Sequence, residues 1–484
     1  MSNGARTGQR RTAPRPGKRP DVLGTRPGLP AAPDAYDRAP IVALWLASLG
    51  LGLVVGIQLA TRSPLSGPGA LPTELGRWCA LLGTYAAMLL VLLVARIPAL
   101  ERSVGLDRMV AYHRRLGPAV ILLIAAHVLL VTMGYAMSES VSFLGEGWTF
   151  LSTYSWLLPA FVGFALMVMA GVTSWRVARR RMKYETWWVT HLYLYLAIAL
   201  AYMHQITVGQ QFVTHQWARW IWIGLYVITF GALLAFRVGL PLYRALHHDL
   251  RVHAVVRESP DTVSVWISGR GLDALAVRGG QFFGWRFLTP QMWWESHPYS
   301  LSAGPDPRYL RITVKDLGDH SRSLARLRPG TRVVAEGPYG VFTADARHGE
   351  RVVLLAGGVG VTPIRAVLDD LPASVRTDVL YRAPKTQALI LHKELEAIAA
   401  KRENLRVRYL VGRRRDYPID ARTLIYLVPD IQTADIYVCG PESFIHAVRE
   451  AAHVLGVPAH KVHHEAFSFH SPDTYGFRPG KGVR

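Results

Sequence analysis

The chain has 484 residues, with 55 Lys and Arg against 34 Asp and Glu, and a formal net charge of +21. Only two cysteines occur, Cys79 and Cys439, so the sequence excludes a disulfide framework and a CxxC metal site. The sequence contains no nucleic-acid motif. Beside long apolar runs, the positive balance therefore indicates basic cytoplasmic loops and contact with anionic lipid, not nucleic acid.

The first 40 residues are rich in Pro, Arg and Gly, with eight Lys or Arg and three Asp. Because this tail has no hydrophobic period, we expect it to be disordered. Six apolar runs follow, each long enough to cross a bilayer as a helix. We place these spans at residues 41–60, 77–97, 117–137, 153–173, 187–206 and 217–238.

Loop charge orients the six spans. The segments after the second and fourth spans are strongly basic, whereas the loops at 138–152 and 205–217 contain no Lys or Arg. Cytoplasmic loops hold the excess of Lys and Arg, so the sequence predicts a multi-pass protein of the cell membrane with both termini in the cytoplasm. The basic residues are Arg96, Arg102, Arg108, Arg114, Arg115, Arg176, Arg179, Arg180, Arg181 and Lys183.

Four histidines inside the apolar runs form two pairs. His113 and His127 are 14 residues apart, and His191 and His204 are 13 apart. Either gap spans about 20 Å along a helix, and loop charge puts His113 and His191 on the inner side. The inner pair is then His113 with His191, and the outer pair is His127 with His204. Each pair could bind a haem iron at both axial positions. A lone histidine in a membrane helix often only bonds a neighbouring helix, but two matched pairs favour iron ligation.

The two gaps differ in helical phase. A gap of 14 returns to nearly the same face of an α-helix, whereas a gap of 13 does not. The second helix is therefore expected to contain a bulge or a bend, or to meet a bound group on another face. His215, in the last outer loop, is the main rival ligand.

From about residue 247 the pattern changes to short alternating strands, RVHAVV, TVSVWIS, QFFGWRF, YLRITVKD and TRVVAEG, which predict a small antiparallel β-barrel. After GPYG at 337–340, strands alternate with helices, which predicts a parallel, doubly wound α/β sheet. The expected domains are a tail at 1–40, a helical membrane domain at 41–245, the barrel at 246–345, a nucleotide-binding domain at 346–470 and a tail at 471–484.

The first strand-to-helix turn of the predicted sheet is AGGVGVTP. Gly357, Gly358 and Gly360 would let the backbone approach a pyrophosphate at the helix N-terminus. Thr362 is expected to cap the helix, and Pro363 suits its first turn. Pro363 stands where GxGxxG has its third glycine, so a simple tight turn also explains this segment.

Residues 41–470 resemble the ferric reductase and NADPH oxidase superfamily. The motifs that carry the resemblance are the two histidine pairs, HPYSLS at 297–302, GPYG at 337–340, AGGVGVTP at 356–363 and VCGPESF at 438–444. The resemblance implies six helices around two b-type haems, an FAD-binding barrel and an NAD(P)H-binding domain like those of ferredoxin reductases. It also implies that His113 and His191 hold the inner haem, and His127 and His204 the outer one.

In the barrel, the resemblance implies contacts of HPYS with the flavin. It places Tyr299 against the isoalloxazine ring and Ser300 near the flavin N5. His297, followed by Pro298, stands where many soluble relatives have an arginine that meets the FAD pyrophosphate.

The segment KDLGDHSRSL resembles the family's second flavin motif. The resemblance implies that Gly318 and Ser321 meet the pyrophosphate, with Lys315 nearby. A strand that ends in a turn is the plainer interpretation of the same segment.

In the last domain, Cys439, Gly440 and Pro441 resemble the motif beneath the nicotinamide, although Cys439 also suits a small buried position at a strand end. HHEAFSF resembles the closing segment that brings an aromatic side chain to the flavin, with Phe467 as first candidate and Phe469 as second. The chain departs from the family pattern by continuing fifteen residues past Phe469.

The resemblance implies that electrons pass from cytoplasmic NAD(P)H through FAD and two haems to an acceptor outside, with ferric iron or its chelates as first choice. Two alternatives stay open: an NADPH oxidase that reduces oxygen to superoxide, and a membrane cytochrome that serves an exported protein partner. Arg382 ends the second strand of the doubly wound sheet, where it would accept a 2′-phosphate and favour NADPH. A solvated basic edge is the competing interpretation.

Overall fold

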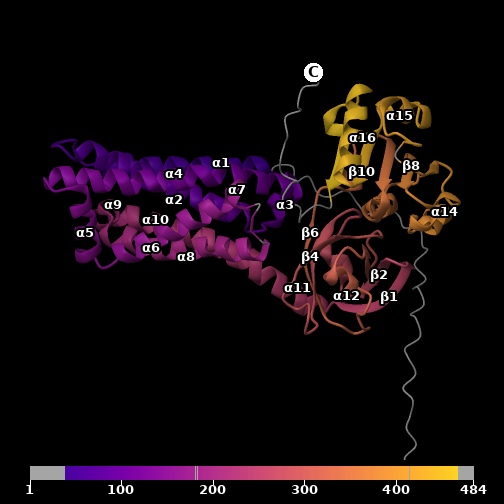
Figure 1. Cartoon of the computed structure of the whole chain (residues 1–484), viewed down its shortest axis with the longest axis horizontal. Coiled ribbons are helices and arrows are strands. Elements are labelled where there is room, and N and C mark those ends of the chain that lie inside the picture. The colour runs from indigo at the N-terminus through magenta and orange to yellow at the C-terminus, as the bar shows by residue number, and fades with distance from the viewer. Residues whose placement is uncertain (1–38, 180, 183, 414, 467–484) are drawn as a thin grey trace, which may run out of the picture. The chain divides into compact units, whose positions relative to one another are not determined.

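The computed structural model describes residues 39–466, except 180, 183 and 414. The predicted tails at 1–40 and 471–484 lie almost wholly outside these residues. The described residues form two compact units, a helical one at 39–242 and one of strands and helices at 243–466 (Figure 1).

The first unit is a bundle of apolar helices. Within the described residues, five helices are long and apolar enough to cross a membrane, at 40–61, 70–93, 108–138, 157–174 and 216–248. The predicted span at 187–206 lies in a helix of 25 residues that is not among these five. A total of six membrane spans therefore stays a prediction. The helices are α1 (Ala39–Thr61), α2 (Ala70–Leu93), α3 (Pro98–Val104), α4 (Leu106–Ser138), α5 (Phe143–Thr153), α6 (Leu157–Ser174), α7 (Arg176–Arg179), α8 (Tyr184–Val208), α9 (Gln210–Thr214), α10 (Gln216–Leu234) and α11 (Leu240–His248), with a π-helical segment at Ala235–Gly239.

The second unit begins with two three-stranded antiparallel sheets, ordered β1-β2-β5 and β4-β3-β6. Their apolar side chains share one core around Trp285, Phe287 and Ile312. Single β-bridges at Arg251–Arg332 and Leu301–Ile312 link the two sheets, but a closed barrel stays a prediction. The strands are β1 (Arg251–Ser259), β2 (Thr262–Ser268), β3 (Phe282–Phe287), β4 (His297–Ser300), β5 (Tyr309–Lys315) and β6 (Val333–Tyr339), and helix α12 (Asp319–Leu324) follows β5.

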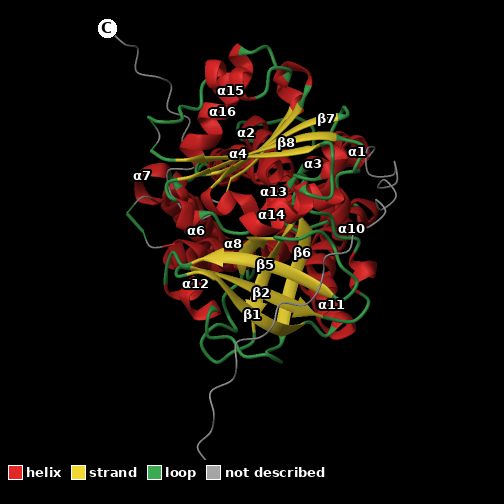
Figure 2. Ribbon diagram, turned by 90° about the vertical axis from the view of Figure 1, so that its right-hand side faces the viewer, coloured by secondary structure: helices red, strands yellow, loops and turns green. Residues whose placement is uncertain are grey.

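The predicted alternation of strands and helices after GPYG is confirmed. Five parallel strands have the order β11-β10-β7-β8-β9, with α13 and α14 on one face and α15 and α16 on the other (Figure 2). The helix expected over ALILHKELEAIAA is shorter than predicted, because Leu391 has a left-handed backbone with φ 56. The elements are β7 (Arg351–Gly357), α13 (Val361–Asp370), β8 (Arg376–Ala383), α14 (His392–Ala399), β9 (Leu405–Val411), α15 (Ala421–Leu427), β10 (Asp435–Gly440), α16 (Glu442–Val454) and β11 (Val462–Ala466).

Carboxylates at the end of α13 join the antiparallel sheets to the parallel sheet. Asp370 accepts the backbone N–H of Gly279 at 2.6 Å, and Asp369 accepts that of Gly304 at 2.8 Å. Burial raises the pKa of Asp370 to about 6. These bonds fix the loops before β3 and after β4 against the nucleotide-binding domain.

In the helical unit, α2 and α4 approach each other closely along a row of glycines. Gly69, Gly76 and Gly83 are seven residues apart, so they lie near one face of α2. A Cβ at Gly76 would lie 2.6 Å from the Cγ2 of Val131 and 3.0 Å from its backbone nitrogen. The absence of side chains therefore lets the backbone of α2 reach the side chains of α4.

We predict that Gly76→Ala destabilises the helical unit by about 1–3 kcal/mol, because the new methyl group would meet the backbone of α4 and force the helices apart. Gly56→Ala is the matched control, since in the part of the chain that the structure describes no atom lies within 4 Å of its Cβ position on α1. Alanine there is expected to be neutral or to stabilise the helix by up to about 1 kcal/mol. Unfolding of both variants in detergent, followed by circular dichroism, measures the difference, and equal stability would contradict the packing argument.

Candidate functional site

The inner histidines meet between α4 and α8. The ring centres of His113 and His191 lie 6.1 Å apart, at an interplanar angle of 62°. Two imidazoles bound at about 2 Å on opposite sides of one metal have ring centres about 6 Å apart, so this separation suits a shared iron. The Nδ1 of His113 lies 3.1 Å from the carbonyl oxygen of Leu90. Because a carbonyl only accepts, Nδ1 carries the proton and the Nε2 lone pair is left for a metal.

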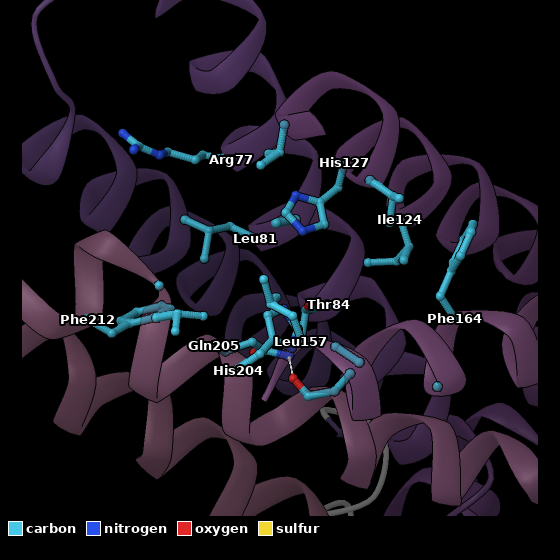
Figure 3. Close-up of a pocket in the computed structure, with 18 of the residues that line it drawn as sticks. Arg77, Leu81, Thr84, Ile124, His127, Leu157, Phe164, His204, Gln205 and Phe212 are labelled. Atoms are coloured by element: carbon cyan, nitrogen blue, oxygen red, sulfur yellow. Dashed lines mark hydrogen bonds between the residues drawn. The ribbon is translucent and has the colours of Figure 1, made fainter. Parts of the chain in front are cut away.

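The outer histidines line one cavity of about 590 Å³ (Figure 3). His127 repeats the arrangement of His113, with its Nδ1 3.0 Å from the carbonyl oxygen of Gly76. Most other lining side chains are apolar, among them Leu81, Phe164 and Phe212. Apolar walls, two imidazoles and this volume fit a haem group. His215, the predicted rival, lies between α9 and α10 and does not line the cavity.

Helix α8 holds its two histidines differently from α4. The chain is α-helical throughout Tyr184–Val208, so the bulge suggested by the gap of 13 is absent. The ring of His191 stacks on Trp187 with centres 5.1 Å apart, and its Nδ1 lies 3.3 Å from the hydroxyl of Ser174. The side chains of His191 and His204 thus project from different faces of a regular helix. The ring centre of His191 lies 6.1 Å from that of His113 of α4, and His204 shares the cavity with His127 of α4.

The HPYS motif is itself a strand, β4, which the alternating pattern did not predict. β4 pairs with β3, where Phe283 lies opposite Tyr299 and Gly284 opposite Pro298. The indole of Trp285 donates to the carbonyl of Tyr299 at 2.9 Å. Burial, and then the charge of Glu295, raises the pKa of Tyr299, so its phenol stays protonated. Ser300 is buried at the end of β4.

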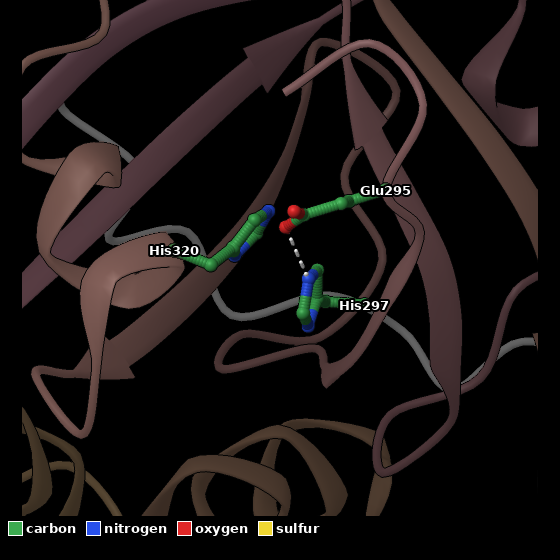
Figure 4. Close-up of side chains that lie close together, drawn as sticks. All are labelled: Glu295, His297 and His320. Atoms are coloured by element: carbon green, nitrogen blue, oxygen red, sulfur yellow. Dashed lines mark hydrogen bonds and ion pairs between the residues drawn. The ribbon is translucent and has the colours of Figure 1, made fainter. Parts of the chain in front are cut away.

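His320 lies against this strand, although no motif in the sequence pointed to it. Its ring stacks on that of His297 with centres 3.5 Å apart, and the Nε2 of His297 donates to the carboxylate of Glu295 at 3.0 Å (Figure 4). The Nδ1 of His320 lies 3.1 Å from the phenol oxygen of Tyr299, while its Nε2 is buried without a partner within residues 39–466. Burial, and then His297, lowers the pKa of His320 to about 4. The only signal in the sequence was its place two residues after Gly318.

The second flavin motif is partly assembled. Gly318 immediately precedes α12, and the hydroxyl of Ser321 donates to its carbonyl at 2.9 Å and accepts the N–H of Leu317 at 2.8 Å. Lys315, in contrast, pairs with Asp261 at 3.3 Å. The structure thus brings Gly318 and Ser321 into one turn and places Lys315 in an ion pair.

The glycine turn follows β7 and leads into α13. Gly358 has a positive φ of +59, and no atom of the described residues lies within 4 Å of its Cβ position, so its backbone is open to a ligand there. A Cβ at Gly360 would lie 2.2 Å from the carbonyl oxygen of Cys439. Thr362 does not cap the helix, contrary to expectation: α13 already begins at Val361, and the Thr362 hydroxyl donates to the Val359 carbonyl at 3.0 Å. Pro363 lies in the first turn, as predicted.

Cys439 is fully buried at the end of β10, next to Gly440, with Pro441 exposed beyond it. Burial, and then the charge of Glu465, raises the pKa of the Cys439 thiol. The thiol therefore stays protonated and fills a small buried position at the end of β10. Arg382 lies beside Gly357 in the register of β7 and β8. Phe467 and Phe469 lie outside the described residues.

Comparison with known proteins gives a match for each unit. Residues 79–202 match the family described as "Ferric reductase like transmembrane component", and residues 354–450 match "Oxidoreductase NAD-binding domain". The chain is 33% identical over 247 residues to the flavohemoprotein of Bordetella pertussis, covering 45% of this chain but only 60% of that protein. It is 33% identical over 192 residues to ferredoxin–NADP reductase B of Sorangium cellulosum, covering 35% of this chain and 77% of that protein.

A solved structure, the FAD/NAD-binding domain of nitric oxide dioxygenase from Vibrio cholerae, is similar at 24% identity with a TM-score of 0.38. The match covers 46% of this chain and 98% of that domain. His113, His127 and His191 lie inside the ferric-reductase-like match, and His204 lies two residues beyond its end.

We predict that His320→Asn reduces the loss of stability on acidification. The folded protein keeps His320 neutral down to about pH 4, whereas an unfolded histidine binds a proton below about pH 6.5, so native stability falls as the pH drops between these values. Because the side chain is partly exposed, we expect this histidine to account for about 1–2 kcal/mol. Asparagine still offers Tyr299 a hydrogen-bond partner but does not titrate.

Thermal unfolding at pH 7.5 and pH 5 measures the effect. His253→Asn is the control, since His253 is exposed and also contacts a tyrosine, with ring centres 4.7 Å from Tyr309. A His320→Asn protein that loses as much stability between the two pH values as the native protein would contradict the prediction.

Proposed function

The chain belongs to the ferric reductase and NADPH oxidase superfamily, and on this premise we propose that it carries electrons from cytoplasmic NAD(P)H across the membrane to an outer acceptor. It is a membrane oxidoreductase with an FAD- and NAD(P)H-dependent reductase module of the ferredoxin–NADP reductase type. The observation that carries the proposal is the placement of four histidines in two groups between α4 and α8, one pair 6.1 Å apart and the other on one cavity.

In this proposal His113 and His191 hold an inner b-type haem, and His127 and His204 an outer one. When bound, FAD converts the electron pair of a hydride into single electrons, which haem iron takes up and releases. The chain itself contributes ligands with fixed tautomers, because backbone carbonyls of α2 hold the Nδ1 protons of both α4 histidines. If His127 and His204 both held the outer haem, an outer acceptor would have no free ligand position on it and would need no acid–base group of the chain.

The reductase unit would hold its two cofactors at the motifs described above. Residues 297–300 would face the flavin, and Gly318, Ser321 and Lys315 its diphosphate. Residues 357–363 and 439–441 would hold NAD(P)H, with Phe467 closing the flavin face. The buried Nε2 of His320 without a partner in the described chain, and the open backbone at Gly358, support ligands at both places.

The acceptor we propose is ferric iron or one of its chelates. Oxygen, reduced to superoxide, is the alternative enzyme activity, and an exported protein partner is the alternative for a cytochrome that only donates electrons. The outer loop at 138–152 contains two acidic residues, Glu139 and Glu146. They give little support to direct capture of iron cations, because only Glu139 is exposed and Glu146 is buried at 4% exposure. Both termini are proposed to be cytoplasmic, since the basic loops follow the second and fourth spans.

Purified protein in liposomes tests the function. A ferric chelate and a ferrous-specific dye are trapped inside, and membrane-impermeant NADPH is added outside, so that only chains whose reductase unit faces outward react. We expect ferrous iron to appear in the lumen. Superoxide formation that outcompetes ferric reduction in air would favour the oxidase, and reduction of neither acceptor would favour a protein partner.

His127→Leu is the matched control for electron transfer across the membrane. It should abolish reduction of lumenal iron while NADPH still reduces a soluble dye outside, because the reductase motifs are untouched. Full lumenal activity in this variant would contradict the proposed route.

We predict that His127→Leu and His204→Leu each lower the haem content from two haems to one per chain, because each removes an axial ligand of the outer site only. Pyridine haemochrome analysis of purified protein measures the content. His215→Leu should keep both haems, since His215 does not line the cavity. Loss of both haems from a folded His127→Leu protein, or of neither, would contradict the pairing.

We predict that Arg382→Ala raises KM for NADPH by about 10- to 150-fold and leaves KM for NADH nearly unchanged, since only NADPH has a 2′-phosphate for a charge-assisted bond. Arg376→Ala, at the opposite end of β8, is the control and should change neither value. Steady-state kinetics with both dinucleotides measure the effect. Equal losses with NADH and NADPH would place Arg382 in folding or pyrophosphate binding instead.

A further inference from the structure

A second group of histidines lies at the edge of the parallel sheet opposite to the glycine turn. Asp435 begins β10, His463 is the second residue of β11, and His348 lies in the loop before β7. Because the strands are parallel, their N-terminal ends share one edge, whereas the turn at 357–360 follows a C-terminal end. This group therefore has no part in nucleotide binding.

Asp435 is fully buried, and its two carboxylate oxygens have different partners. Oδ2 accepts the backbone N–H groups of His348 at 3.0 Å and Gly349 at 2.9 Å. Oδ1 lies 3.3 Å from the Nδ1 of His348 and 3.2 Å from the Nε2 of His463. One oxygen is thus anchored by the backbone, and the other is presented to two imidazoles.

The neighbouring side chains keep this arrangement in place. The ring of His463 stacks on Tyr437 with centres 4.5 Å apart, and the Tyr437 phenol donates to the Thr343 carbonyl at 2.9 Å. A third imidazole, of His460, has its centre 4.9 Å from that of His348. Such anchoring by stacking and backbone bonds is the usual support of metal-binding side chains.

We propose that His348, Asp435 and His463 bind a divalent transition metal of the zinc class, with His460 as the nearest fourth donor. The three donor atoms lie within 4.8 Å of one another. Ligands of a tetrahedral Zn²⁺ at about 2.0–2.1 Å are about 3.3 Å apart, which is close to both measured distances to Oδ1. Two imidazoles and one carboxylate suit zinc, cobalt or nickel, whereas calcium and magnesium prefer oxygen ligands alone.

The other group of three such donors in the described residues, Glu295, His297 and His320, belongs to the flavin site and carries no separate proposal. At the sheet edge, the alternative to a metal is a pair of hydrogen bonds from the two imidazoles to Oδ1. An amide side chain can donate the same hydrogen bond as an imidazole but is a poor ligand for zinc. Amide substitutions therefore distinguish a metal site from a pair of hydrogen bonds.

A bound metal would tie the loop before β7 and the edge strand β11 to β10. Among the described strands, β11 pairs with β10 only, and in the sequence it is followed directly by Phe467. The metal would therefore stabilise the last strand of the reductase unit at the end remote from the cofactors.

The experiment uses full-length protein in detergent, stripped of metal with a chelator and dialysed against buffered free Zn²⁺. Elemental analysis gives zinc per chain, and thermal unfolding with and without zinc gives the shift in Tm. His348→Asn and His463→Gln place an amide nitrogen near the positions of Nδ1 and Nε2, so both keep a donor to Oδ1. His446→Gln is the control, since His446 is exposed on α16 and forms a long, exposed ion pair with Glu450 at 3.7 Å.

The double variant combines His348→Asn with His463→Gln. We expect the native and His446→Gln proteins to bind one more zinc per chain than the double variant. Zinc should raise Tm in the native and His446→Gln proteins but not in the double variant. Each single variant should bind at least about 10-fold more weakly. Equal zinc content and affinity in the native protein and the double variant would overturn the proposal. If the double variant lost its FAD or its native circular dichroism, His348→Asn alone would decide, because that side chain is 49% exposed; native affinity there would overturn the proposal.

Discussion

The close approach of α2 to α4 is the constraint on which the membrane part of the site depends. A carbonyl inside a helix keeps a second lone pair for another donor, and a carbonyl in the last turn, such as that of Leu90 in α2, lacks the regular bond within its helix. The row of glycines on α2 brings carbonyl groups of α2 within reach of α4. The carbonyl of Leu90 accepts the Nδ1 proton of His113, and the carbonyl of Gly76 accepts that of His127. Leu90 and Gly76 are 14 residues apart, as are the two histidines, so one antiparallel helix pair repeats the same contact twice.

This repeated contact has a chemical consequence. A neutral imidazole can carry its proton on either nitrogen, and only the nitrogen without the proton can bind a metal. The carbonyls of α2 select the tautomer with the proton on Nδ1 in both α4 histidines, before any metal is present. The side chains that line the outer cavity are mostly apolar and offer few groups that could compete for Nε2, which suits the proposed role of His127 as a haem ligand.

Most of this architecture could be predicted from the sequence, but the role of α2 could not. Histidines in apolar runs and basic residues in loops can be recognised in the sequence. Every residue has a backbone carbonyl, so the sequence does not show which carbonyl accepts a bond from a histidine. The change from a period of two to alternating strands and helices predicted the reductase unit, since side-chain periodicity follows directly from strand and helix geometry. β4 was missed because it has only four residues and contains Pro298, which is unusual in a strand. His320 was missed because its contact with Tyr299 depends on a turn that no periodic pattern describes.

The 13-residue gap on α8 is accommodated by a regular helix whose two histidines project from different faces. Along a regular helix, 14 residues turn the side chain by only about 40° from its starting face, but 13 residues turn it by about 140°. The gap predicted a bulge, a bend or a bound group on another face; α8 is continuous through both histidines, so the bulge is absent and the bound group stays a prediction. The regular helix instead presents His191 to Ser174 and Trp187 on one side and His204 to the cavity on another. The two sites therefore differ in their walls: a stacked indole beside the inner pair, and a roomy apolar cavity at the outer pair. Equal ligands in unequal surroundings are the physical means by which a protein gives two otherwise identical metal groups different reduction potentials.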